Sequence, residues 1–96
     1  MPAYLVVRVE IINFEKYKQY LAAVPDVIAK YDGKYVVRAG DMVTLEGPEE
    51  KRRIVIIEFP TIEGAKEFYN SKGYQEIKKL RKDSAIGEII VVEGVK

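Results

Sequence analysis

The sequence predicts a single α+β domain in which an antiparallel sheet carries helices on one face. Two observations carry this prediction. Strand-like and helix-like segments alternate in the order strand, helix, two short strands, strand, helix, strand, and each helical pattern follows a residue that can cap a helix. The chain of 96 residues is long enough for one domain and too short for two, so we expect residues 1–96 to fold as one unit.

The first third of the chain predicts a strand followed by a long helix. Residues 4–12 form a β-branched stretch with polar residues at every second place, which favours a strand. Asn13 can cap the following helix, whose apolar residues recur three and four positions apart as far as Tyr31. Pro25 removes a backbone donor from this pattern, so we expect a kink or a break near Val24.

The middle of the chain predicts three strands. Residues 34–38 and 42–45 are short strand-like segments, and the Ala-Gly-Asp sequence between them suits a tight hairpin. Residues 53–59 give the strongest strand signal in the chain, and Pro60 ends it.

The last third predicts an interrupted helix and a closing strand. Thr61 can cap a helical pattern that breaks at residues 70–73 and resumes as far as Arg81, and residues 85–93 read as the last strand. With no repeat or linker, this order corresponds to two split βαβ units. The prediction is therefore a ferredoxin-like βαββαβ sandwich with an antiparallel sheet and helices on one face.

The predicted strands are apolar on both sides. Residues 54–57 and 89–92 are unbroken apolar runs, whereas an antiparallel sheet that is wetted on one face alternates apolar with polar residues. The helices can cover one face only, so we expect a second copy of the chain to cover the other and form a homodimer. The alternative is a monomer whose second face is shielded by the stems of Lys and Arg side chains.

Composition excludes several classes of function. The chain has no Cys and no His, which removes disulfides, thiolate nucleophiles and the most frequent metal ligands, so we expect no metal and no cofactor. A formal net charge of +1 with interspersed signs predicts neither a nucleic acid nor a membrane as partner. No signal-like start is visible, which makes the cytoplasm the expected location. The amino-acid composition is rich in charged residues and poor in Asn and Gln, which is typical of heat-adapted proteins.

Charged residues inside apolar strands are candidates for a binding site, because a buried charge must be paired or hydrogen-bonded. One interpretation is structural pairing between neighbouring strands or across the dimer. The other is a pocket in which Arg38 and Arg81 bind an anionic group, Glu58 accepts a hydrogen bond or a proton, and Arg8 supports them.

The chain has seven tyrosines and only three phenylalanines, and this preference indicates a second set of candidate binding residues. Tyr17 lies on the apolar face of the first helical pattern, and Tyr69 and Tyr74 flank the break in the second, so their hydroxyls could point at a ligand. The alternative is that each ring fills the core with its polar tip reaching water or backbone, and this is the interpretation we prefer for Tyr20, Tyr31 and Tyr35.

Several segments in this order resemble the domain-of-unknown-function 1330 family of the dimeric α/β-barrel superfamily. The residues that carry the resemblance are spread over nearly the whole chain: Tyr4 to Val9 with Arg8, Tyr17 and Tyr20, Tyr31 to Lys34, Val37 to Gly40, Ile57 to Pro60, Phe68 to Ser71, Tyr74, Leu80 with Arg81, and Val91 to Gly94. The resemblance implies a homodimer whose sheets pack face to face, with a small-molecule cleft between each sheet and its helices. Ala39 stands where family members usually have Gly.

These inferences converge on a small homodimeric protein that binds a small, partly anionic organic molecule between sheet and helices. Cofactor-independent catalysis, with tyrosines and arginines steadying an enolate-like charge and Glu58 as proton acceptor, is one extension of this hypothesis. A binding or sensing module without turnover, or a structural dimer that presents its helices to a protein partner, are the alternatives.

Overall fold

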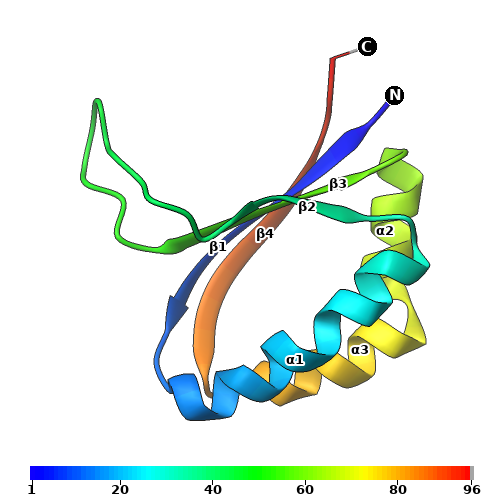
Figure 1. The fold of residues 1–96 in the computed structure, drawn as a ribbon, viewed down its shortest axis with the longest axis horizontal. Helices are drawn as coiled ribbons and strands as arrows, with labels where there is room; N and C mark the ends of the chain where they lie inside the picture. The colour runs from blue at the N-terminus through cyan, green and yellow to red at the C-terminus, as the bar shows by residue number, and fades with distance from the viewer. Residues whose placement is uncertain (96) are drawn as a thin grey trace.

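A computed structural model describes residues 1–95 and shows one antiparallel sheet with its helices gathered on one side (Figure 1). The elements are β1 (Ala3–Ile11), α1 (Phe14–Lys30), β2 (Lys34–Arg38), β3 (Arg53–Phe59), α2 (Ile62–Asn70), α3 (Lys72–Lys78), the 3-10 helix η1 (Lys79–Arg81) and β4 (Ala85–Glu93). The strands lie in the order β2-β3-β1-β4, and each pair of neighbours is antiparallel. The predicted ferredoxin-like βαββαβ fold is therefore confirmed.

Side-chain caps start α1 and α2 after the two residues that the sequence predicts, and a third cap, at Ser71, lies inside the predicted break and starts α3. Asn13, Thr61 and Ser71 each accept a hydrogen bond on the side-chain oxygen from the backbone amide three residues further along. Ser71 lies between α2 and α3, so this one residue ends α2 and caps the start of α3 at the predicted break. These bonds satisfy amides that the first turn of a helix leaves without an intrahelical partner.

The predicted break at Pro25 does not occur, because α1 continues through it to Lys30. Val24 and Ile28, on either side of the proline, are both buried in the core. Burial of this apolar face holds the helix together even though Pro25 leaves one backbone acceptor without its usual donor.

The prediction of a strand over residues 42–45 is wrong. β2 pairs directly with β3, and residues 39–52 form a loop that projects from the edge of the sheet (Figure 1). Val43 and Leu45 are 78% and 88% exposed in this loop, so they have no strand beside them to pair with. A segment whose residues favour a strand does not form one unless a neighbouring strand pairs with it.

The core lies between the sheet and the helices. Its fully buried members come from β1, β3, α1, α2 and α3: Leu5, Val24, Ile28, Ile57, Phe59, Ala65, Phe68 and Tyr74. α2 packs on β1, β3 and β4, while α1 packs beside α3 and η1. The helices thus cover one face of the sheet, and the cavities of the candidate site lie between the helices and that face.

Candidate functional site

The space between sheet and helices holds an inner pocket of about 40 Å³. Its floor is the apolar face of β1, β3 and β4, which is formed by Leu5, Val7, Val55, Ile57 and Ile89. Its walls and roof carry polar atoms on Tyr17, Tyr20, Tyr35, Arg38, Arg53, Tyr69 and Tyr74. The volume is enough for one or a few water molecules, and the polar atoms around it provide partners for them.

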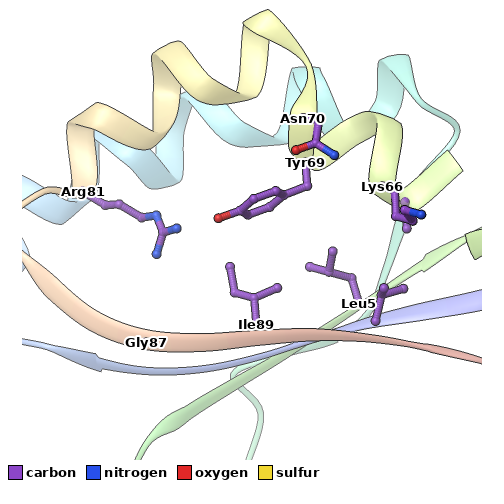
Figure 2. A pocket seen from close by; sticks show the side chains of 9 residues that line it. Leu5, Lys66, Tyr69, Asn70, Arg81, Gly87 and Ile89 are labelled. Atoms are coloured by element: carbon purple, nitrogen blue, oxygen red, sulfur yellow. The ribbon is translucent and has the colours of Figure 1, made fainter. Parts of the chain in front are cut away.

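An outer cleft of about 350 Å³ adjoins the inner pocket. Leu5, Tyr69 and Ile89 line both spaces, so they form the boundary between them. Figure 2 shows Leu5 and Ile89 pointing up from the sheet toward Tyr69, whose hydroxyl end extends in the direction of Arg81. We call the pocket and the cleft together the tyrosine–arginine site.

Aromatic rings run through the site in an unbroken series. The Tyr17 and Tyr20 rings stack with their centroids 5.3 Å apart, and the Tyr20 hydroxyl is hydrogen-bonded to the Tyr74 hydroxyl at 2.9 Å. The Tyr69 ring lies 5.3 Å from the Tyr74 ring. Offset and tilted aromatic pairs at these distances stabilise one another, so the rings form one aromatic surface along the site.

Tyr69 is held in place at two points. The Lys78 ammonium donates a hydrogen bond to the Tyr69 hydroxyl at 2.8 Å, and the Gln75 side-chain amide donates one to the Tyr69 carbonyl at 2.7 Å. Both partners lie on α3, so the break after α2 allows α3 to support the residue that divides pocket from cleft.

Three arginines reach the site from different elements. Arg38 ends β2, with its guanidinium carbon 4.5 Å from the centre of the Tyr35 ring. Arg53 begins β3, and Arg81 ends η1 with its guanidinium carbon 5.7 Å from the centre of the Tyr20 ring. Contacts with the negative face of an aromatic ring compensate part of the guanidinium charge.

The charge of these arginines is not balanced by carboxylates. No Asp or Glu lines the inner pocket or the outer cleft, and within residues 1–95 the ion pairs use Lys18, Arg52 and Lys79 instead. The Nε atoms of Arg53 and Arg81 are buried and have no hydrogen-bond partner in the same part of the chain. Since a buried donor without an acceptor is unfavourable, the site is suited to a molecule that brings acceptors with it.

Tyr17, Tyr20 and Tyr35 stay protonated at neutral pH, because their surroundings raise the pKa of each phenol. Burial raises the pKa of Tyr17, a shift that the nearby Arg53 and Arg81 partly oppose. Burial also raises the pKa of Tyr35, against the opposing effect of Arg38 and Arg53. For Tyr20, burial and the neighbouring Tyr74 hydroxyl raise the pKa strongly. The site therefore offers phenol O–H and guanidinium N–H donors and has no ionised base among these groups.

Five of the seven residues predicted for the site come together there: Tyr17, Arg38, Tyr69, Tyr74 and Arg81. Arg8 and Glu58 do not. Arg8 follows the inward-facing Val7 in β1, and Glu58 lies between the buried residues Ile57 and Phe59 in β3, so both point to the other side of the sheet. Glu58 therefore cannot accept a proton from a molecule in the pocket.

Sequence analysis missed Arg53, Tyr20 and Tyr35 as residues of the site. Arg53 shares the inward-facing alternation of Val55, Ile57 and Phe59, and this alternation was the signal that could have identified it. No such alternation could have identified Tyr35, because an irregularity between Tyr35 and Val37 interrupts the alternation of inward and outward side chains in β2.

The sheet face without helices, which we call the open face, remains apolar. A row of side chains crosses all four strands, because Val6 in β1 pairs with Ile56 in β3 and with Ile90 in β4, and Ile56 pairs in turn with Val37 in β2. Ile90, Val92 and Ile86 are 54%, 50% and 64% exposed on this side. A monomer seldom leaves so many large apolar side chains together in water.

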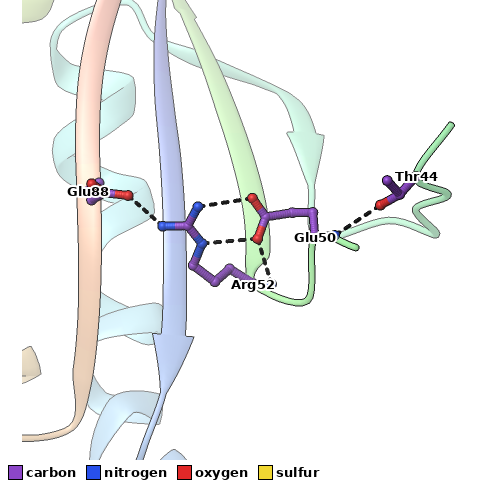
Figure 3. A network of polar contacts seen from close by, with 4 residues as sticks. All are labelled: Thr44, Glu50, Arg52 and Glu88. Carbon is purple, nitrogen blue, oxygen red and sulfur yellow. Dashed lines mark hydrogen bonds and ion pairs between the residues drawn. The ribbon is translucent and has the colours of Figure 1, made fainter. Parts of the chain in front are cut away.

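A charged cluster on the open face fixes the loop of residues 39–52 to the sheet (Figure 3). Arg52 binds both carboxylate oxygens of Glu50 at 3.0 Å and also pairs with Glu88 on β4. The Glu50 amide in turn donates to the Thr44 hydroxyl at 2.9 Å. Hydrogen bonds from Arg52 lower the pKa of Glu50 to about 2, so this carboxylate stays ionised down to acidic pH.

Two further classes of site find no support within residues 1–95. No three His, Cys, Asp or Glu side chains there gather closely enough to hold a metal ion. None of the helices in this part of the chain has the length and apolarity needed to cross a membrane.

Comparison with known proteins identifies the family. The family described as "Domain of unknown function (DUF1330)" matches residues 2–95. The chain belongs to this family. No curated protein matches the sequence of this DUF1330 member.

Solved structures share the fold of this DUF1330 chain at low sequence identity. A protein of unknown function from Rhodopseudomonas palustris is 20% identical, with a TM-score of 0.79 over 99% of this chain and 83% of that one. SnoaB, a cofactor-independent oxygenase from Streptomyces nogalater, is 10% identical, with a TM-score of 0.70 over 99% and 94% of the two chains. A dimeric ferredoxin-like protein of unknown function from Bacteroides fragilis is 11% identical, with a TM-score of 0.57 over 97% and 96%.

Proposed function

We propose that this protein binds a small, partly anionic organic molecule in the tyrosine–arginine site. The observation that carries the proposal is the excess of positive charge there: Arg38, Arg53 and Arg81 line the site, and no carboxylate of residues 1–95 does. The forked guanidinium group binds carboxylates and other planar oxyanions through paired, charge-assisted hydrogen bonds. An anion would also supply the acceptors that the Nε atoms of Arg53 and Arg81 lack.

The ligand should also have an apolar, ring-like part. The floor of the site is aliphatic and its walls are aromatic, which favours flat apolar groups through stacking and exclusion of water. Aromatic carboxylic acids combine this part with the anionic group, and they are therefore the probes of choice.

Binding without turnover fits the site better than catalysis does. Abstraction of a proton needs a base. Within residues 1–95 no Asp or Glu lines the site, Glu58 lies on the opposite face, and Tyr17, Tyr20 and Tyr35 are protonated phenols. Catalysis is the second candidate function, because a cofactor-independent oxygenase has a similar fold. Mass spectrometry of a bound acid after long incubation in air distinguishes the two, because a binding protein returns the acid unchanged.

The protein acts as a homodimer in this proposal, with the open faces of two copies packed together. If six to eight apolar side chains become buried, the gross gain is on the order of 10 kcal/mol before the cost of association. The dimeric protein of the same fold from Bacteroides fragilis supports this assembly. The tyrosine–arginine site lies on the opposite side of the sheet, so dimerisation leaves it accessible.

A thermal-shift comparison tests the binding function. Aromatic carboxylates should raise the melting temperature of the protein, and the corresponding primary amides should not, because ligand binding stabilises the folded state by mass action. Arg38→Gln and Arg53→Gln should reduce the rise, while Lys30→Gln, which removes an exposed charge at the end of α1, should leave it intact. Equal shifts for acids and amides, or no shift with any acid, would count against the proposal.

A further inference from the structure

The positive charge of the tyrosine–arginine site is divided between two ends. Arg38 and Arg53 stand on β2 and β3, at one side of the sheet, whereas Arg81 reaches the outer cleft beside Gly87 and Ile89 of β4, the strand at the other edge. Neighbouring strands are spaced at about 4.8 Å, so two to three strand spacings separate the strands at the two ends by roughly 10–14 Å. A single carboxylate cannot contact both ends at once.

The tyrosines between the arginines indicate the same division. Burial raises the pKa of Tyr35, and Arg38 and Arg53 oppose this rise. Burial and Tyr74 raise the pKa of Tyr20, and Arg81 opposes that rise. Only Tyr17 among these three is within the electrostatic reach of both Arg53 and Arg81. Tyr17 therefore lies in the middle of the site, between its two positive ends.

The floor between the two ends is apolar. Leu5, Val7 and Ile89 line the inner pocket below Tyr17, and Leu5 and Ile89 continue into the outer cleft. A ligand that crossed this floor would need an apolar middle part, because a polar group there would lose water without gaining a partner.

The Arg81 end continues into a groove of about 520 Å³, which is lined by Lys78, Lys79 and Lys82 and by one acidic residue, Glu76. Arg81 and Gly87 line both this groove and the outer cleft, so the two are continuous. Lys79 is engaged with Glu76 at 3.6 Å, and Lys78 with the Tyr69 hydroxyl at 2.8 Å. The second end thus offers additional positive charge to an acidic group bound at Arg81.

We infer that the ligand of this site is an elongated dianion with an apolar aromatic middle, one acidic group bound by Arg38 and Arg53 and the other by Arg81. The inference rests on the proposed binding function and narrows its ligand class. Because Tyr69 divides pocket from cleft and the inner pocket is small, such a ligand must move the Tyr69 ring aside and displace the water of the pocket.

Calorimetric titration with three related acids tests the inference. Biphenyl-4,4′-dicarboxylate carries its acidic groups on two linked rings, biphenyl-4-carboxylate lacks one of them, and terephthalate keeps both on one ring and is too short to span the ends. The long diacid should bind at least about tenfold more tightly than either of the other two, the gain expected for one additional charge-assisted interaction.

Variants at each end complete the test. Arg81→Gln and Arg53→Gln should each remove the advantage of the long diacid while the monoacid still binds at the remaining end, and Lys30→Gln should retain the advantage. Circular dichroism and the melting temperature verify that each variant is folded. If the monoacid binds but the long diacid binds no better, or if its advantage survives Arg81→Gln, the dianion inference is wrong and the binding function stands. If none of the acids binds, the proposed function itself fails.

Discussion

The hydroxyl oxygens of Tyr20 and Tyr74 lie 2.9 Å apart although 54 positions separate these residues in the sequence. Tyr20 belongs to α1 and Tyr74 to α3, so this bond joins the two helices above the inner pocket. One of the two hydroxyls donates its proton to the other, and the accepting hydroxyl can then direct its own proton to a different acceptor.

Removal of the Tyr74 hydroxyl should destabilise the fold. Tyr74 is only 1% exposed, and Tyr74→Phe leaves the partly buried Tyr20 hydroxyl without its partner, so the substitution should lower the free energy of unfolding by about 1–3 kcal/mol. Chemical denaturation measures the change. Tyr31→Phe is the matched control, because Tyr31 packs on Phe68 without a side-chain hydrogen bond within residues 1–95, and it should change stability by less than about 0.5 kcal/mol. Equal effects of the two substitutions would show that the Tyr20–Tyr74 bond contributes nothing.

The raised pKa values of Tyr17, Tyr20 and Tyr35 predict a loss of stability in alkali. A raised pKa favours the neutral phenol in the folded state, so its contribution is complete below the ordinary value of 10.0 and is lost as the pH rises above it. Denaturation curves between pH 8 and pH 11 should show this decline, and Tyr20→Phe should make it shallower.

Phenolate absorbance gives an independent measurement of the same prediction. The phenolate absorbance that Tyr17, Tyr20 and Tyr35 contribute, identified from the Tyr→Phe variant of each, should appear at higher pH in the folded protein than in urea. Contributions that appear over the same pH range in both states would contradict the burial described for these three residues.

Substitution of Gly33 should disturb the core below α1. A Cβ atom at Gly33 would lie 2.7 Å from Cε1 of Phe59 and 2.8 Å from Cγ2 of Ile28, and both of these side chains are buried. Gly33→Ala should therefore cost about 1–3 kcal/mol of unfolding free energy through overpacking. Gly40→Ala has no atom within 4 Å of the new Cβ and should leave stability almost unchanged in the same denaturation assay. A neutral Gly33→Ala would mean that this part of the core is loosely packed.

A lysine at the centre of the open face should separate the proposed dimer. Ile90 pairs with Val6 in the apolar row, so Ile90→Lys would place a charge in the interface, and light scattering should then report half of the wild-type mass. Ala22→Lys adds the same charge to an exposed position on α1 and should leave the mass unchanged. Wild-type protein that is monomeric at micromolar concentration would overturn the homodimer.

Periodicity and capping residues predicted the elements well because they act locally. The bounds predicted for β2, β3 and β4 agree with the structure, and Asn13, Thr61 and Ser71 start helices by bonds to amides three residues away. The segment 42–45 shows the limit of this reasoning: its composition favours a strand, but whether a strand forms depends on a neighbour that only the folded chain supplies.

The site was harder to predict, because both faces of the sheet are apolar. When polar residues do not mark the outward positions, alternation alone does not say which face is inward, so the sequence places Arg8 and Glu58 in the pocket and gives no indication that Arg53 belongs there. The pairing of Val9 with Arg53 removes the ambiguity, since Val9 is buried under the helices. Pairing registers and contacts such as Tyr20 with Tyr74 are long-range facts that one sequence does not contain.

The most direct test of the anion-binding site is an NMR titration that follows the Nε–H signals of the arginines while biphenyl-4-carboxylate is added. Arg53 and Arg81 have buried Nε atoms without a partner, so their signals should move with increasing acid, together with the ring signals of Tyr17 and Tyr20. The amide of the same acid should leave them unmoved. Signals that stay in place with the acid, or that move only for Arg8 and Arg52 outside the site, would contradict the account.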